Sequence, residues 1–189
     1  APPLFRPTRA DTYDGNGWLV TQVTSLAPGE TYTVRHSYDA AKGVRTSTTD
    51  ARGNRTDYCY DVAPDGSATG SRGLLTRTIA PSAQHSDGPA RPTTITEYDA
   101  RNRPVRVYPP QGVVTVGLSA VTCGTDLSAR LNPSFATFKA YSERNELVRV
   151  DQPFFDYDTN GIGTTFHTAT TTYEYSATWP GQVTFETPP

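Results

Sequence analysis

The sequence predicts an all-β protein built from consecutive β-hairpins, and three observations lead to this prediction. Thr, Val and Tyr recur at every second position in segments such as 93–98 and 170–175, which is the pattern of a strand with one buried face. The chain contains 16 Pro and 15 Gly, which leave little room for helices. A Tyr-Asp pair followed by a turn signal also recurs along the chain. These features favour one β region over residues 1–189.

The repeat is clearest in residues 38–61, which read YDAAKGVRTSTTDARGNRTDYCYD. Self-similarity of this kind indicates an architecture made of similar units. Each unit begins at a tyrosine, and the expected openers are Tyr13, Tyr38, Tyr60, Tyr98, Tyr141, Tyr157 and Tyr175. Because the spacing between openers varies, we expect insertions between units and not a strict solenoid.

Each opener precedes a polar turn that reverses the chain. An Asp side chain accepts hydrogen bonds from the backbone two residues on, and Gly adopts the positive φ that other residues resist. The residues expected to shape the turns are Asp14, Gly17, Asp39, Gly43, Asp50, Gly53, Asp61, Asp99, Asp158 and Gly161.

Residues 113–136 carry no copy of the repeat and form an insertion within the β region. Residues 113–118 alternate in polarity and residues 123–126 read as a turn, so we expect one extra hairpin in the sheet. A plug and a partner-binding loop are the alternatives. The best helical candidate, residues 134–143, is equally well suited to a strand because it contains Thr and aromatic residues.

The units resemble the YD-repeat family, the Rhs and teneurin group of large extracellular or secreted β proteins. The strongest match is the segment 38–61, and the Pro-Gly at 28–29 is similar to the closing Pro-x-Gly of the family pattern. In that family the hairpins join edge to edge into a spiralling sheet that closes into a shell, which houses a toxic or signalling domain or presents an adhesive surface. The resemblance therefore implies an extended or spiralling antiparallel sheet that forms a segment of a shell or barrel wall.

The composition agrees with a secreted β protein. With 35% hydrophobic residues and a net charge of −2, the chain is too polar to span a membrane and too evenly charged to indicate a nucleic-acid partner. The chain has no Met, so we expect a mature product or an excised section of a longer chain. Cys59 and Cys123 could pair or remain free, since pairing needs Cα atoms within about 7 Å of each other.

Residues 156–161 form the candidate metal site. Asp156, Asp158 and Asn160 offer oxygens at alternate positions before Gly161, which is how a calcium loop begins. His167 stands where such a loop has a bidentate Glu, and a hard cation does not favour imidazole. The same residues also fit an ordinary turn of the repeat. We expect no other cofactor.

No pattern in the sequence indicates catalysis, and we expect no enzymatic activity. His36, His85 and His167 are isolated, and the chain lacks the spacings typical of a zinc site or a nucleophilic serine. Exposed aromatic residues are the other candidate site. Trp179 lies in a turn and is the first candidate for a surface contact, with Phe154 and Phe155 as further stacking residues for sugar rings, whereas Trp18 is expected in the core.

Three functional hypotheses follow from these predictions. The first is a structural β-scaffold that forms part of a cargo-enclosing shell or a cell-surface structure. The second is a subunit that assembles with identical copies into a filament or tube by strand addition, since sheet edges have unpaired N–H and C=O groups. The third is a module that binds a carbohydrate or a cell-surface receptor. In the first two hypotheses the partners are neighbouring repeat segments or identical subunits that pair through the sheet edges.

Overall fold

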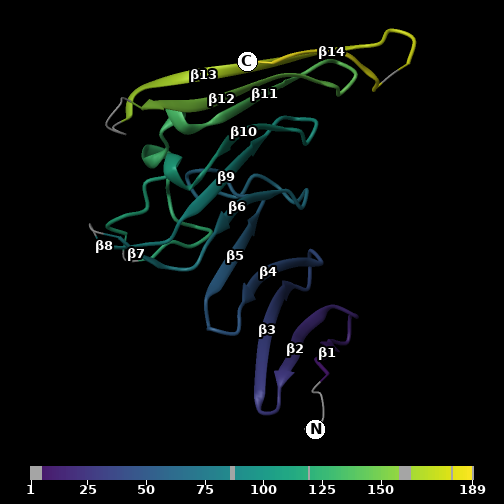
Figure 1. Cartoon of the computed structure of the whole chain (residues 1–189), viewed down its shortest axis with the longest axis vertical. Helices are drawn as coiled ribbons and strands as arrows, with labels where there is room; N and C mark the ends of the chain where they lie inside the picture. The colour runs from purple at the N-terminus through teal and green to yellow at the C-terminus, as the bar shows by residue number, and fades with distance from the viewer. Residues whose placement is uncertain (1–5, 86–87, 119, 158–162, 180, 189) are drawn as a thin grey trace.

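A long twisted β-sheet extends along the whole molecule (Figure 1). The computed structural model describes residues 6–85, 88–118, 120–157, 163–179 and 181–188. Within these residues, twelve strands form one antiparallel sheet and two short strands form a separate hairpin. The sheet contains β1 (Thr8–Tyr13), β2 (Leu19–Ala27), β3 (Glu30–Asp39), β4 (Val44–Thr49), β5 (Arg55–Tyr60), β6 (Leu75–Ile79), β9 (Thr93–Tyr98), β10 (Pro104–Tyr108), β11 (Thr137–Tyr141), β12 (Leu147–Tyr157), β13 (Gly163–Tyr175) and β14 (Val183–Thr187).

The order of strands in the sheet follows the order of the chain. Each strand pairs with its neighbours in sequence, except that the hairpin of β7 (Ala83–His85) and β8 (Gly88–Ala90) is looped out between β6 and β9. The expected all-β fold of consecutive hairpins in one extended antiparallel sheet is therefore confirmed. This order leaves β1 and β14 at the two edges of the sheet.

One turn chemistry recurs in the hairpins. The Asp14 carboxylate accepts two backbone N–H groups at 2.9 Å, and Gly17 follows with a φ of +80°. Asp99 also accepts two backbone N–H groups, with Asn102 at a φ of +64°. In the β11–β12 turn the hydroxyl of Ser142 accepts the corresponding bonds. An oxygen acceptor at the first position and a residue that tolerates positive φ therefore suffice to form this turn.

A β-bulge follows the opener tyrosine in every hairpin at one end of the sheet. Tyr13 pairs with Leu19 and Thr12 pairs with Thr21, so Val20 is an extra residue on the return strand. The same shift in register occurs between each of five later openers and the residue before it, at Tyr38, Tyr60, Tyr98, Tyr141 and Tyr175. The extra residues are Val20, Thr46, Thr76, Val105, Val148 and Thr184, which are all β-branched. A bulge bends its strand and increases the local twist, so each hairpin carries the same bend.

Tyr157 differs from the other predicted openers. It ends β12, which runs antiparallel to the strands that contain the other six openers. Its hairpin therefore lies at the opposite end of the sheet, together with the turn between β4 and β5 that contains Asp50 and Gly53. The Tyr-Asp dipeptide thus marks a hairpin without fixing the end of the sheet at which the hairpin lies.

The prediction that residues 113–136 add a hairpin to the sheet is wrong. In the part of this segment that the structure describes, β-pairing is limited to a single bridge between Val113 and Leu131. The segment also contains two short 3₁₀ helices. These helices are η2 (Ser128–Arg130) and η3 (Pro133–Phe135), and η1 (Pro110–Gly112) precedes the segment. The segment lies across one face of the sheet, because its apolar residues pack inward. The chain then re-enters the sheet as β11, within the range that the sequence left open between helix and strand.

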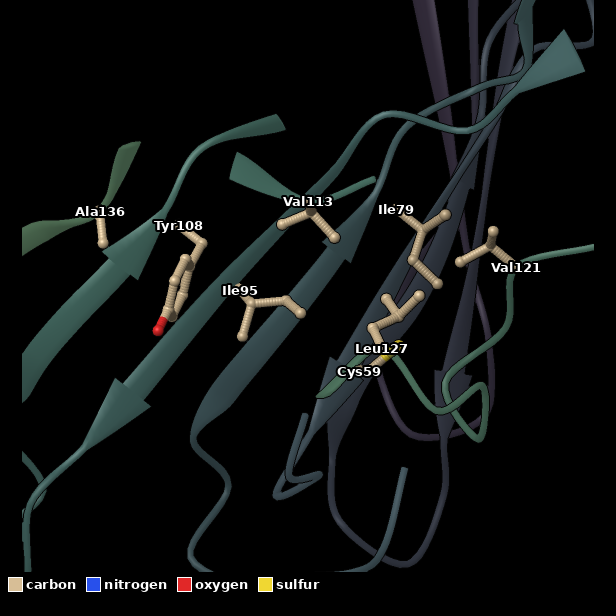
Figure 2. Packing of buried hydrophobic residues seen from close by; sticks show 8 residues of the cluster. All are labelled: Cys59, Ile79, Ile95, Tyr108, Val113, Val121, Leu127 and Ala136. Carbon is tan, nitrogen blue, oxygen red and sulfur yellow. The ribbon is translucent and has the colours of Figure 1, made fainter. Parts of the chain in front are cut away.

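The hydrophobic core lies under this segment, at the middle of the sheet. Strands β5, β6, β9 and β10 contribute Cys59, Ile79, Ile95 and Tyr108 from one face, and the segment places Val121 and Leu127 over them (Figure 2). Val113 and Ala136 complete the cluster. By contrast, the edge strands are mostly exposed, and every residue of β14 is exposed.

Candidate functional site

Residues 113–136, here called the cover segment, bury one face of the central strands. Leu127 is fully buried and Val121 is 2% exposed, and both contact the core cluster that contains Cys59 and Ile79. Burial of two aliphatic side chains contributes roughly 3–6 kcal/mol. The packing alone therefore favours the docked position of the cover segment.

A disulfide joins Cys59 of β5 to Cys123 of the cover segment, with Cα atoms 5.4 Å apart. The sequence left open whether these cysteines pair. The bond closes a loop with a sequence separation of 64 residues. Closing a loop of that length in the unfolded chain corresponds to a stabilisation of about 4 kcal/mol in the chain-entropy treatment. The bond thus anchors the cover segment to the middle of the sheet.

The buried guanidinium of Arg77 holds the cover segment from the next strand, because Arg77 of β6 pairs with Cys59 of β5 and lies on the same face of the sheet. Arg77 is 1% exposed, and its two terminal nitrogens donate to five backbone carbonyl groups at 2.9–3.2 Å. A buried charge is tolerated only where hydrogen bonds replace its hydration. The five carbonyls are those of Ala63, Pro64, Thr122, Cys123 and Thr125. One side chain therefore ties β6 to both the β5–β6 loop and the cover segment.

The charge of Arg77 interacts with two carboxylates at the surface. Burial lowers the pKa of Arg77, while Asp126 and Asp65 act in the opposite direction. The hydroxyl and backbone N–H of Ser67 lower the pKa of Asp65, and those of Ser128 lower the pKa of Asp126. The guanidinium is therefore stabilised by carbonyl dipoles at short range and by two ionised carboxylates farther away.

Arg91 also holds the cover segment, at Val121, directly before the residues that Arg77 contacts. Its guanidinium donates to the Asp57 carboxylate at 2.9 Å and to the carbonyls of Arg55 at 2.9 Å and Val121 at 3.3 Å. Its Nε also donates to the carbonyl of Ala80 at 3.0 Å. Arg91 thereby joins β5, the end of β6 and the cover segment.

The cover segment also approaches the β5–β6 loop closely. The N–H of Leu127 donates to the carbonyl of Pro64 at 2.8 Å. A Cβ on Gly66 would overlap the backbone carbonyl of Gly124, and Gly66 has a φ of +85°. Gly66 therefore satisfies two requirements at once, the close approach and the left-handed backbone.

A small cavity of about 180 Å³ lies between the β5–β6 loop and β9, lined in part by Pro64, Leu74 and Tyr98. Sites for drug-sized ligands are typically about 300–1,000 Å³. Burial raises the pKa of Tyr98, and its hydroxyl donates to the carbonyl of Leu75 at 3.0 Å. Tyr98, one of the titratable residues that line this cavity, thus has a structural role.

Four opener tyrosines connect their hairpin to the preceding one. Tyr38 donates its hydroxyl to the carbonyl of Leu19 at 3.0 Å, and Leu19 is the residue that pairs with the previous opener, Tyr13. We call this contact a tyrosine latch. Equivalent latches join Tyr98 to Leu75, Tyr141 to Pro104 and Tyr175 to Leu147. Each acceptor again pairs with the preceding opener at that end of the sheet. Among the described residues the latch therefore recurs at four junctions, and Tyr60 is the opener that does not form it.

The other predicted turn residues fit the hairpins as follows. Asp39 accepts two N–H groups and Gly43 has a φ of +67°. Asp50 and Gly53 form the β4–β5 turn. Asp61 is buried and closes the longer β5–β6 loop by accepting the N–H groups of residues 73 and 74.

The predicted calcium site falls largely outside the described residues. The structure describes the backbone of Asp156 but not its side chain, and Asp158, Asn160 and Gly161 lie outside the described ranges. Among the residues that are described, no group of three or more His, Cys, Asp or Glu side chains could hold a metal ion. Calcium binding by residues 156–161 therefore stays a prediction.

The predicted aromatic site is not a single platform. Trp179 is 68% exposed in the β13–β14 turn, whereas Phe154 is 49% exposed and stacks on His167 with ring centroids 5.2 Å apart. His167 and Tyr175, which ends β13 beside the Trp179 turn, are eight residues apart on one strand, or roughly 25 Å. The side chain of Phe155 lies outside the described residues.

Trp18 is partly buried, and its ring stacks on that of Tyr38 at 5.2 Å. It therefore strengthens the contact between the first two hairpins.

The part of the chain that the structure describes contains no helix with the length and hydrophobicity of a membrane span.

Sequence reasoning did not identify the roles of Arg77 and Arg91, here called the clamp arginines, or the tyrosine latch. Arg77 lies in the strand sequence Leu-Thr-Arg-Thr-Ile, where its position, two before a buried Ile, places it on the inward face. That alternation was the available signal, but a strand arginine normally points to solvent. The partners of Arg77 in the cover segment are more than 40 residues away, so no local pattern identifies them.

Comparisons with known proteins give a likeness in structure. No family model matches the chain, and no curated protein matches it in sequence. A crystal structure of TcdB2-TccC3-Cdc42 aligns with a TM-score of 0.60 at 15% identity, covering 97% of this chain and 8% of that chain. The chain thus spans about one twelfth of the length of that protein.

Two further structures align with lower scores. They are the Photorhabdus luminescens Tc holotoxin pore with a mutation in TccC3, at a TM-score of 0.41, 14% identity and 95% coverage of this chain, and TcdB2-TccC3-TEV, at 0.26, 15% and 95%. The chain covers 10% and 11% of those chains. The alignment with TcdB2-TccC3-Cdc42 shows a likeness in fold over nearly the whole antiparallel sheet of this chain.

Proposed function

We propose that this chain is a structural, non-enzymatic segment of a YD-repeat β wall. The tyrosine latch carries the proposal, because the same hydroxyl-to-carbonyl contact joins successive hairpins at four junctions. A unit that bonds to its predecessor in this way can be added repeatedly without a new interface. The clamp arginines and the pKa shifts described above all belong to structural contacts, which supports a scaffold and not a catalyst.

We further propose that the wall encloses a cargo such as a toxin domain. The support is the likeness in fold to one segment of a TcdB2-TccC3 chain that is about twelve times as long. One sheet of twelve strands with two exposed edges supplies only a section of a closed wall. More repeats, or more copies, would be needed to close it.

The wall is proposed to work outside the cell, as part of a secreted or cell-surface protein. A disulfide between β5 and the cover segment is the supporting observation, since such bonds persist in oxidising compartments. Growth of the sheet by strand addition would place the neighbouring repeat segments at β1 and β14.

Light scattering and electron microscopy of the purified chain test the wall proposal. We expect a native mass that exceeds the chain mass of 20.5 kDa and rises with concentration, with curved, single-layered particles in the images. A denatured mass measured beside it controls for covalent aggregation. Compact monomers at every concentration would count against the wall and favour a self-contained binding module.

Binding of a carbohydrate is the second candidate, and the exposure of Trp179 favours it. A tryptophan that is 68% exposed in a turn can stack on a sugar ring without rearrangement. A glycan array with the native chain and the Trp179→Ala variant tests this function. Loss of a glycan signal in the variant alone would support it, with Tyr32→Phe as the control at another exposed aromatic residue.

A further inference from the structure

The two exposed edges of the sheet are complementary to each other. We propose that β14 of one copy pairs with β1 of a second copy in a single register, with Tyr13 of the second copy as the latch onto Val183. This inference rests on the proposed wall function, because it names the partner and the residues of edge-to-edge growth. Both residues are accessible, with Tyr13 58% and Val183 46% exposed.

The register follows from a regularity at the internal junctions. Arg149 of β12 pairs with Thr172 of β13, so two residues farther on Leu147 lies opposite Glu174. Leu147 is the partner of the previous opener, and Glu174 directly precedes the next opener, Tyr175. The same alignment holds between β2 and β3, β4 and β5, β6 and β9, and β10 and β11. Five junctions in one sheet therefore share one register.

Applying this register to the edges gives a definite set of pairs. Val183 is the partner of the last opener, so the residue before the first opener, Thr12, falls opposite Val183. Tyr13 then reaches the Val183 carbonyl, as Tyr175 reaches that of Leu147. The strands also match in length, since β1 has six residues and β14 has five. The remaining pairs are Asp11 with Thr184, Ala10 with Phe185, Arg9 with Glu186 and Thr8 with Thr187.

The side chains agree with these pairs. Arg9 and Glu186 are opposite charges at directly facing positions, which stabilises an antiparallel pair. Phe185 is 56% exposed and faces the small Ala10, so its ring would gain burial without a clash. A slip by one residue would turn Phe185 to the other face and separate the charged pair.

Prolines limit the pairing at its other end. Pro7 precedes β1 and Pro188 follows β14, and the proposed register places them opposite each other, just beyond the last pair. A proline has no N–H for the ladder, so any longer overlap would introduce missing hydrogen bonds. The edges therefore allow one register of five residue pairs, and the strand that pairs with each edge belongs to a second copy of this chain.

Cysteine cross-linking tests the register. One preparation carries Ala10→Cys and another carries Phe185→Cys, and they are mixed under mild oxidation. Facing residues of antiparallel strands have Cα atoms about 4.5–5.5 Å apart, which a disulfide can span. The matched control mixes Ala10→Cys with Val183→Cys, a diagonal pair at about 7–8 Å. We expect covalent dimers at least about ten times faster in the first mixture than in the control.

A second variant tests the latch itself. Tyr13→Phe removes one hydroxyl donor, and we expect association measured by light scattering to weaken about fivefold, as for the loss of one hydrogen bond. Tyr32→Phe is the control, because Tyr32 is 47% exposed but lies in β3, away from both edges. Equal effects of the two variants would overturn the role of Tyr13.

The outcomes separate this proposal from the wall function. Association with equal cross-linking in both mixtures would overturn the register and leave the wall proposal standing. Monomers at all concentrations, without cross-links, would overturn both. Fast cross-linking of the facing pair together with weaker association of Tyr13→Phe supports the proposed junction.

Discussion

Replacing Arg77 by Met tests how much the buried guanidinium stabilises the protein. The two shortest of its five bonds, to the carbonyls of Thr125 at 2.9 Å and Thr122 at 3.0 Å, are the strongest. Hydrogen bonds to a charged group contribute about 1.5–3 kcal/mol each, so these two contribute about 3–6 kcal/mol before the desolvation of Arg77 is subtracted. The variant removes that desolvation penalty but leaves carbonyls without donors at about 1–3 kcal/mol each. We therefore expect a net loss of about 3–5 kcal/mol.

Urea unfolding of Arg77→Met, with tryptophan fluorescence as the signal, measures this loss. Hydrogen exchange should also show reduced protection at Leu127, whose N–H donates to the carbonyl of Pro64 across the same contact. Arg55→Met is the matched control, because the Arg55 side chain is 60% exposed, and we expect less than about 1 kcal/mol there. A loss below about 1 kcal/mol for Arg77→Met would refute the view that the hydrogen bonds of Arg77 to backbone carbonyls stabilise the protein.

Three further predictions concern the same region. Reduction of the disulfide should lower the free energy of unfolding by about 4 kcal/mol in urea, and an unchanged midpoint would contradict its anchoring role. Gly66→Ala, which meets the cover segment, should lower the melting temperature several degrees more than Gly53→Ala, which has a similar φ of +83° but open space around it. Burial raises the pKa of Asp61, but the backbone N–H groups of residues 72–74 and the charge of Lys42 together outweigh it and leave the pKa below its usual value. Its stabilisation is therefore present above about pH 4 and is lost as the pH falls through the lowered pKa, so Asp61→Asn should flatten the acid limb of stability against pH.

The hairpins could be predicted from the sequence because their determinants are local. Asp14 and Gly17, or Asp99 and Asn102, lie within four residues of each other, and they form the turn through an Asp carboxylate that accepts backbone N–H groups and a residue with positive φ. Period-2 alternation then gives the strands on either side. The end of the sheet at which a turn lies depends on the count of strands before it, which is why Tyr157 could not be placed from its own sequence.

The cover segment could not be predicted because its contacts are distant in sequence. Residues 113–118 alternate as a strand would, yet the segment has a neighbouring sheet face to bury against, and tertiary packing outweighs the local pattern. The disulfide was left open for the same reason, since the distance between Cys59 and Cys123 depends on where the segment docks. Trp179 was placed correctly in an exposed turn, but its separation from Phe154 became visible only once β13 was seen as one long strand.

The bulges have a consequence for the shape of any larger assembly. Every hairpin at the opener end gains one residue on its return strand and none on its outgoing strand. Each unit therefore adds the same bend and the same extra twist, so the surface coils as it grows. The radius of the coil is then a property of a single unit, whereas the extent of the surface depends on the number of units. Evolution could lengthen such a surface by duplication and keep its curvature unchanged.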